Sequence, residues 1–206
     1  MDGGFATYDK FRDSSMPESW CTSHPDVTPL ALRALLPYQE KYQVARSVSD
    51  AIQCLSADCL PDGTLPAFWW ILRWYTAAAW METWDMLGKY NHEIDVFPRL
   101  HWEAAEQDCH DCTSILDEAL LMECAVYSGK TDIVTKIRER LVSTQLPNGL
   151  WPVEPALCQT TPGVYQPWEL DQRETICPEE FGIYSTASIL RALALVEDQN
   201  LREWPP

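Results

Sequence analysis

The chain has 206 residues, of which 46% are apolar, enough to bury one good core, so we expect a single domain over residues 1–206. The formal net charge of −16 disfavours nucleic acid and anionic membrane surfaces as partners, because both require basic patches. No segment approaches the ~18 apolar residues of a membrane span. No apolar run follows a basic start, so we expect no secretory signal, a cytoplasmic location and reduced cysteines.

Apolar residues recur with the period of an α-helix in most of the chain, and no segment alternates as a strand does. Turn signals such as Pro61-Asp62-Gly63 and Pro147-Asn148-Gly149 separate the helical segments. The sequence therefore predicts an all-α protein. In chain order, its helices are expected at about residues 28–36, 41–55, 69–87, 112–127, 132–143 and 185–197.

The tetrapeptide Leu-Arg-Ala-Leu occurs twice, at Leu32–Leu35 and at Leu190–Leu193. Each copy stands at the same place relative to the start of an expected helix. Such repetition of helical units favours an α/α array of helix pairs over a simple bundle.

One turn carries a recognisable repeat. The run from Gln145 through Gly149 to Trp151 fits the pattern Gln, short spacer, Gly, any residue, Trp, and it follows an expected helix. Looser versions occur at Asp2–Phe5 and Asp62–Leu65. The chain thereby resembles the squalene-cyclase and prenyltransferase superfamily, whose QW repeat has this form. In such a repeat Gly allows the sharp turn, and Gln and Trp lock it to the neighbouring helix.

The resemblance implies an α/α toroid with inner and outer helix layers. In complete cyclases two such domains enclose an apolar cavity, whereas this chain is about one domain long. We therefore expect a partial or single-domain toroid, whose open edge a homodimer or a partner subunit could cover.

A polar hexapeptide, Asp108-Cys109-His110-Asp111-Cys112-Thr113, opens the apolar helical run after it. Class II terpene cyclases begin an inner helix with Asp-x-Asp-Asp, whose middle acid protonates an alkene or epoxide. On this resemblance Asp108 and Asp111 are the outer acids, and His110 replaces the middle one. An imidazolium with an ordinary pKa of about 6.5 is too weak an acid for an alkene. It suits an epoxide or carbonyl, with a neighbouring Asp fixing the tautomer of the ring.

The catalytic candidates are therefore Asp108, His110 and Asp111, and the alternative is a helix cap of solvated acids. An aromatic run could line an apolar cavity and stabilise cationic intermediates, although packing in the core is an equally simple role. The candidate substrate-binding residues are Phe68, Trp69, Trp70, Trp74 and Tyr75.

The resemblance implies a terpenoid or polyene cyclase-like enzyme, of the isomerase or lyase class, that folds an apolar small-molecule substrate. No cofactor is expected. The alternative is a non-catalytic module of the same fold that binds an isoprenoid, a lipid or another protein on its concave face. An enzyme predicts a closed apolar pocket reached by His110, and a binding module predicts an open groove.

Cys109 and Cys112 form a Cys-x-x-Cys pair that could hold zinc together with His110 or Asp111. Beyond His92 and His101 the sequence shows no convincing distant partner, and we therefore expect no bound metal. Elemental analysis of the purified protein should therefore find no stoichiometric zinc. One zinc per chain that is lost on Cys109→Ser with Cys112→Ser would contradict this.

Overall fold

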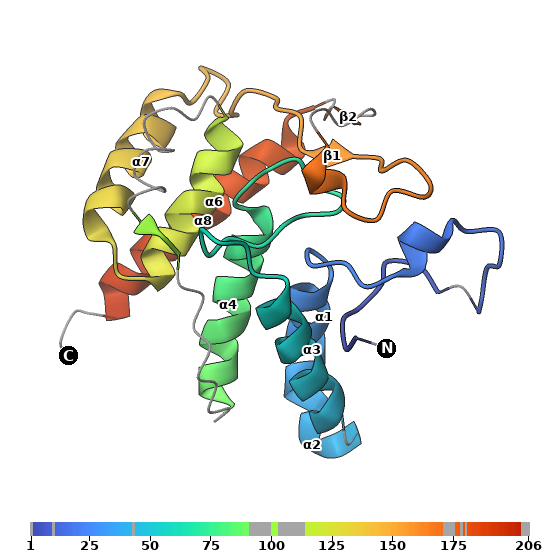
Figure 1. The fold of residues 1–206 in the computed structure, drawn as a ribbon. Coiled ribbons are helices and arrows are strands. Elements are labelled where there is room, and N and C mark those ends of the chain that lie inside the picture. The colour runs from blue at the N-terminus through green and yellow to red at the C-terminus, as the bar shows by residue number, and fades with distance from the viewer. Residues whose placement is uncertain are drawn as a thin grey trace.

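The computed structural model describes residues 2–9, 11–42, 44–90, 100–102, 114–170, 176–177, 179 and 181–202. This part of the chain is predominantly helical, as expected (Figure 1). Its helices are α1 (Thr28–Leu35), α2 (Gln39–Tyr42), α3 (Ala45–Ala57), α4 (Tyr75–Lys89), α6 (Ile115–Tyr127), α7 (Thr131–Ser143) and α8 (Ile183–Arg202). Short 3-10 helices lie at Glu18–Cys21, Leu36–Tyr38 and Pro167–Glu169, and the strands are β1 (Leu157–Cys158) and β2 (Ile176–Cys177). None of the described helices is both long and apolar enough to cross a membrane.

The helices form two layers. In one layer α1 contacts α4, α4 contacts α6, and α6 contacts α8 (Figure 1). On the other side α3 packs against α1, and α7 packs against α6 and α8. We call α1, α4, α6 and α8 the inner layer, and α3 and α7 the outer layer. Over the described residues, the chain passes from inner α1 to outer α3 and back to inner α4, and from inner α6 to outer α7 and back to inner α8.

The core follows this layering. Helix α6 is buried along almost its whole length because α4, α7 and α8 cover it on three sides. A second apolar cluster joins α3 to the inner layer. The buried side chains of that cluster are Leu32, Leu36, Val48, Ala51, Leu55, Leu65, Trp80 and Leu87.

Two turns between helices share one geometry, at Leu60–Leu65 and Leu146–Trp151. In each turn the N–H of the first Leu donates to the carbonyl four residues on, Leu60 to Thr64 and Leu146 to Leu150, both at 2.8 Å. The glycine N–H donates back to the carbonyl of that Leu, at 2.9 Å in both turns. Gly63 has φ 81° and Gly149 has φ 83°, a conformation that favours glycine. The Asp62 and Asn148 side chains each accept the N–H two residues on. The Leu-Pro-Asp/Asn-Gly sequence is therefore a repeated joint.

Trp151 connects three elements at its joint. Its ring is 3% exposed, and its Nε1 donates to the Leu141 carbonyl of α7 at 2.7 Å. Its backbone N–H donates to Thr186 Oγ1 on α8 at 3.2 Å, and Gln145 Nε2 donates to the Gly149 carbonyl at 2.9 Å. Burial and hydrogen bonding of one ring thus fix the passage from α7 toward α8.

The start of α4 differs from the sequence prediction. The helix begins at Tyr75, not at Trp69. The backbone before it is held by tertiary hydrogen bonds: Asp26 Oδ2 accepts from Phe68 N at 3.1 Å and Trp69 N at 2.8 Å, and Cys158 N donates to the Trp69 carbonyl at 2.7 Å. These partners replace the bonds that an earlier helical turn would make. Next to them lies the short β1–β2 pair, which the sequence did not indicate.

Trp151→Ala is expected to lower the free energy of unfolding by roughly 3–5 kcal/mol, because a large buried ring is lost. Trp151→Phe should cost about 1 kcal/mol, since it keeps most of the ring but loses the bond to Leu141. Urea unfolding followed by circular dichroism measures both. The neighbouring Leu150→Ala, at a 38% exposed position, is the control and should change stability by less than about 0.5 kcal/mol. Unchanged stability in Trp151→Ala would mean that the joint does not depend on this ring.

Candidate functional site

A cavity of about 280 Å³ lies among the four inner helices. Each of α1, α4, α6 and α8 contributes to its wall, and one side of the cavity is open to solvent. Small apolar residues and Leu leave the space open, and tyrosine and arginine give it polar groups. The lining residues are Leu30, Arg33, Tyr75, Ala78, Ala79, Leu120, Tyr184, Ala187, Ser188 and Arg191.

Four charged side chains, one from each inner helix, meet beside this cavity. Arg33 of α1 and Arg191 of α8 both bond the same oxygen of Glu82 on α4, Arg191 at 2.5 Å. Arg191 Nη2 also lies 3.1 Å from Glu123 Oε2 on α6. We call these four residues the charge cluster. It ties the first and last helices of the inner layer to the two between them.

Glu123 is the most buried member of the charge cluster, with a side chain that is only 1% exposed. Its approach to Arg191 is an ion pair without hydrogen-bond alignment, so among the described residues neither of its oxygens accepts a hydrogen bond. Burial raises the pKa of Glu123 to about 7, although Arg191 and Arg33 oppose the rise. Burial also lowers the pKa of Arg33 from its ordinary value. Glu123 can therefore change its protonation near neutral pH.

The two tyrosines of the cavity belong to an aromatic group with Trp70. The Trp70 ring stacks on Tyr75 with centroids 4.0 Å apart, and lies 5.0 Å from the ring of Tyr184. Burial raises the pKa of Tyr75 above its ordinary value, and it raises the pKa of Tyr184 to about 12. Both phenols therefore stay protonated and can donate hydrogen bonds at neutral pH.

The structure separates the five aromatic residues selected from the sequence. Tyr75 lines the cavity and Trp70 packs against it. Trp74 is 2% exposed and lies in the core between helices, where its backbone N–H donates to Asp117. Phe68 and Trp69 lie in a different cluster. The substrate-binding role of all five stays a prediction.

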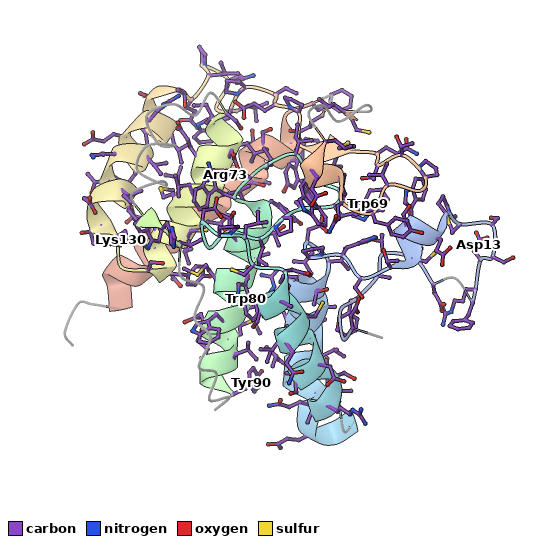
Figure 2. All side chains as sticks on the ribbon, viewed as in Figure 1. Asp13, Trp69, Arg73, Trp80, Tyr90 and Lys130 are labelled. Carbon is purple, nitrogen blue, oxygen red and sulfur yellow. The ribbon has the colours of Figure 1, made fainter. Side chains whose placement is uncertain are left out.

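The aromatic cluster that contains Phe68 and Trp69 joins the N-terminal segment to the loop around β1. Figure 2 shows Trp69 between these two segments. The Trp69 ring packs against Tyr8 and Trp20. His24, only 1% exposed, stacks on Phe68 with centroids 3.9 Å apart. Its Nδ1 lies 2.9 Å from Thr7 Oγ1 and its Nε2 lies 2.9 Å from the Ser19 carbonyl, so both ring nitrogens are bonded. Burial lowers the pKa of His24, which favours the neutral ring.

The proposed acid motif, Asp108, His110 and Asp111, lies outside the described residues, as do Cys109 and Cys112. The described start of α6 directly follows it in sequence. There Ser114 Oγ accepts from Asp117 N at 3.0 Å as the N-cap. Glu154 accepts from Ser114 Oγ at 2.6 Å and from Ile115 N and Leu116 N, each at 2.9 Å. A carboxylate from the segment after Trp151 thus holds this helix end.

The sequence interpretation missed Glu154 and the charge cluster as parts of the site. A signal for the cluster existed: Arg33 and Arg191 are the arginines of the two Leu-Arg-Ala-Leu copies. Nothing in the sequence indicated that they converge, since the contact joins residues far apart in the chain. Within the described residues, no group of three or more His, Cys, Asp or Glu side chains is placed to hold a metal ion.

No protein-family profile matches the sequence, and none of the curated proteins is significantly similar to it. Solved structures do share its fold. A protein from Actinoplanes superposes with a TM-score of 0.73 at 20% identity, over 95% of this chain and 65% of that one. The type II terpene cyclase MstE from Scytonema gives 0.66 at 18% identity, over 97% and 64% of the two chains. An MstE variant in complex with its substrate geranylgeranyl dihydroxybenzoate gives 0.67 at 17% identity, over 96% and 63%.

The chain therefore has a terpene cyclase-like, all-α toroid-like fold. The likeness to the solved structures establishes the fold alone. The chain spans less than two thirds of the length of each of these neighbours.

The buried acid of the charge cluster predicts a pH dependence of stability. Between the ordinary carboxyl pKa of about 4.5 and the folded value of about 7, the folded protein holds a proton on Glu123 that the unfolded chain releases. Stability should therefore fall as pH rises through this window. Glu123→Gln should remove roughly 2–3 kcal/mol of the loss between pH 5 and pH 8, measured by urea unfolding.

Some pH dependence should remain in this variant, because burial raises the pKa of Glu118 to about 7 as well. Glu197→Gln, at a side chain 60% exposed on the far end of α8, is the matched control and should leave the pH profile unchanged. Identical profiles for wild type and Glu123→Gln would contradict a proton held at Glu123.

Proposed function

We propose that this protein is a terpene cyclase-like enzyme that folds a prenyl substrate against the inner helices. The observation that carries the proposal is the fold shared with substrate-bound MstE over 96% of the chain. The cavity among α1, α4, α6 and α8 supports it, because all four inner helices contribute to its wall. MstE acts on a geranylgeranyl chain, and an apolar prenyl chain is the substrate class that we propose here.

The described aromatic residues suit such chemistry. Tyr75 and Tyr184 line the cavity, and Trp70 stacks on Tyr75 behind it. An aromatic ring face can stabilise a carbocation that passes over it. Phe68, Trp69 and Trp74 would then not contact the substrate. They would hold the backbone before α4 and the core in place. Shape and pre-organisation of the substrate would supply most of the rate.

We propose His110 as the proton donor and Asp108 or Asp111 as the group that orients its ring. These residues directly precede Ser114, so the sequence ties them to the end of α6 that Glu154 holds. An imidazolium suits an epoxide or a carbonyl better than an alkene, because its pKa is ordinarily about 6.5. The reaction would therefore start from an oxygenated prenyl chain.

The cavity is small for enclosing a whole prenyl substrate. At about 280 Å³ it lies at the lower limit of ligand pockets, which run from ~300 to ~1,000 Å³. A second copy of the chain or a partner subunit that covers the open side would enlarge and close it. We propose this arrangement for the active protein, and a cytoplasmic setting for it.

A binding module without catalysis is the second candidate, and the charge cluster is the observation that favours it. Charged groups beside a cavity can bind a polar group of a ligand as readily as they can take part in catalysis. Turnover separates the two functions. A module should retain a co-purified or added prenyl ligand unchanged, whereas an enzyme should convert it.

The test is incubation with geranylgeranyl dihydroxybenzoate and with its terminal epoxide, followed by mass spectrometry and NMR of the products. Wild type is expected to cyclise the epoxide. His110→Ala should reduce turnover by about 100-fold or more, because the proton donor is lost. Asp111→Asn should reduce it less, through a misoriented ring.

His101→Ala is the matched control, since His101 is an exposed histidine in the same part of the sequence. It should leave turnover unchanged. Full turnover in both His110→Ala and Asp111→Asn would reduce the hexapeptide to a helix cap. Binding of the epoxide without any product in wild type would favour the module.

A further inference from the structure

Two equivalent arginines converge at the cavity from opposite ends of the inner layer. Arg33 belongs to the first copy of Leu-Arg-Ala-Leu, on α1, and Arg191 belongs to the second, on α8. Both line the cavity and both bond one carboxylate oxygen, Oε2 of Glu82. The contact with Glu82 therefore shows that these two guanidinium groups can bind one carboxylate together.

Arg191 has donors to spare for a ligand. Its side chain is 49% exposed, whereas that of Glu123 beneath it is 1% exposed. Among the described residues, its contacts with Glu82 and Glu123 use Nη2 alone. A guanidinium carries five N–H donors in a planar fork, so Nε and Nη1 remain to bond a ligand or water.

Further donors stand around the pair. Tyr75, Tyr184 and Ser188 line the same cavity, and each carries a hydroxyl group that can donate a hydrogen bond. The rest of the wall is apolar, formed by Leu30, Ala78, Ala79, Leu120 and Ala187. A pure hydrocarbon would strip water from the charged groups and return no hydrogen bond. The wall instead matches a molecule with one anionic group and an apolar body.

The charge balance also allows an anion to enter. Two arginines face two glutamates, so the charge cluster is neutral when Glu123 is ionised. The groups facing Glu123 are Arg33 from α1, Arg191 and Tyr184 from α8, and Tyr127 of its own helix. When Glu123 takes up a proton, the cluster gains a net positive charge and attracts an anion.

We propose that Arg33 and Arg191 bind a carboxylate carried by the substrate, so that the substrate class is a prenyl acid and not an uncharged polyene. Planar pairing of guanidinium with carboxylate gives this contact its geometric selectivity. The inference rests on the proposed function for the prenyl part of the ligand. It adds the residues that would recognise a carboxylate, a group that geranylgeranyl dihydroxybenzoate also carries.

Calorimetric titration with farnesoic acid and with its methyl ester tests the proposal at pH 7.5. The two probes share the prenyl chain, and only the acid offers a carboxylate. Wild type should bind the acid at least about tenfold more tightly, since a charge-assisted hydrogen bond contributes this much. Arg191→Gln should abolish the preference, because the affinity for the acid should fall much more than the affinity for the ester, and Arg191→Lys should restore part of the preference. Arg138→Gln is the matched control, because Arg138 is 50% exposed and paired with Glu197 away from the cavity.

A gain of affinity gives an independent readout. Glu123→Gln should bind the acid several-fold more tightly than wild type at pH 8, because the amide removes a negative charge that competes with the ligand. A purely structural role of the charge cluster would not produce this gain, so its absence would count against the proposal.

Equal affinity of wild type for acid and ester, or an unchanged preference in Arg191→Gln, would overturn the carboxylate site and leave the prenyl-binding function standing. Failure of wild type to bind either probe would overturn both.

Discussion

Carboxylates that accept backbone N–H groups from distant segments hold this helix array in register. Asp26, next to α1, accepts from the segment before α4, and Asp117 on α6 accepts from Trp74 N at 2.9 Å at the start of α4. Glu154, from the segment after Trp151, accepts from Ile115 N at 2.9 Å at the start of α6. At the starts of α4 and α6 these bonds satisfy helix-end donors that have no partner within their own helix, and they place a negative charge at the positive end of the helix dipole. Asp26 instead holds the non-helical backbone of Phe68 and Trp69. Because donor and acceptor belong to different elements, each bond also fixes one inner helix relative to its neighbours.

The cavity depends on that register. The charge cluster requires side chains from four helices to meet within hydrogen-bond distance, and a shift of one helix by a turn would separate them. Burial of Glu123 makes the requirement stricter, because a buried carboxylate without its arginine is costly. Such a cluster favours one arrangement of the inner layer, and the same geometry leaves a polar opening beside apolar walls.

The sequence predicted the features that depend on local pattern. Helical periodicity located α1, α6 and α7 to within a few residues, and the QW-like run correctly marked Trp151 as a residue with a structural task at a turn. It failed where tertiary contacts override the local preference. The local pattern predicts a helix at Trp69, but the Trp69 backbone is hydrogen-bonded to Asp26 and Cys158, so α4 starts later.

The candidate site shows the same division. Tyr75 was selected because it belongs to an aromatic run, and it lines the cavity. Arg33, Glu82, Glu123 and Arg191 come from helices separated by long stretches of chain, and their meeting is a property of the packed layers. The repeated Leu-Arg-Ala-Leu indicates repetition of a helical unit, but the pattern alone assigns no role to its arginine. Periodicity identifies which face of a helix is buried, but it does not identify what that face meets.

The convergence of Arg33 and Arg191 has a consequence for how such sites arise. An array that curves on itself brings equivalent positions of different repeats toward a common centre. When a helix pair is duplicated, a side chain that points to this centre is duplicated with it. A second donor for a ligand can thus appear through repetition of the chain alone, already aimed at the first. Later divergence need only adjust the residues between the two donors. Here Glu82 and Glu123 lie between the arginines and pair with them from within the array.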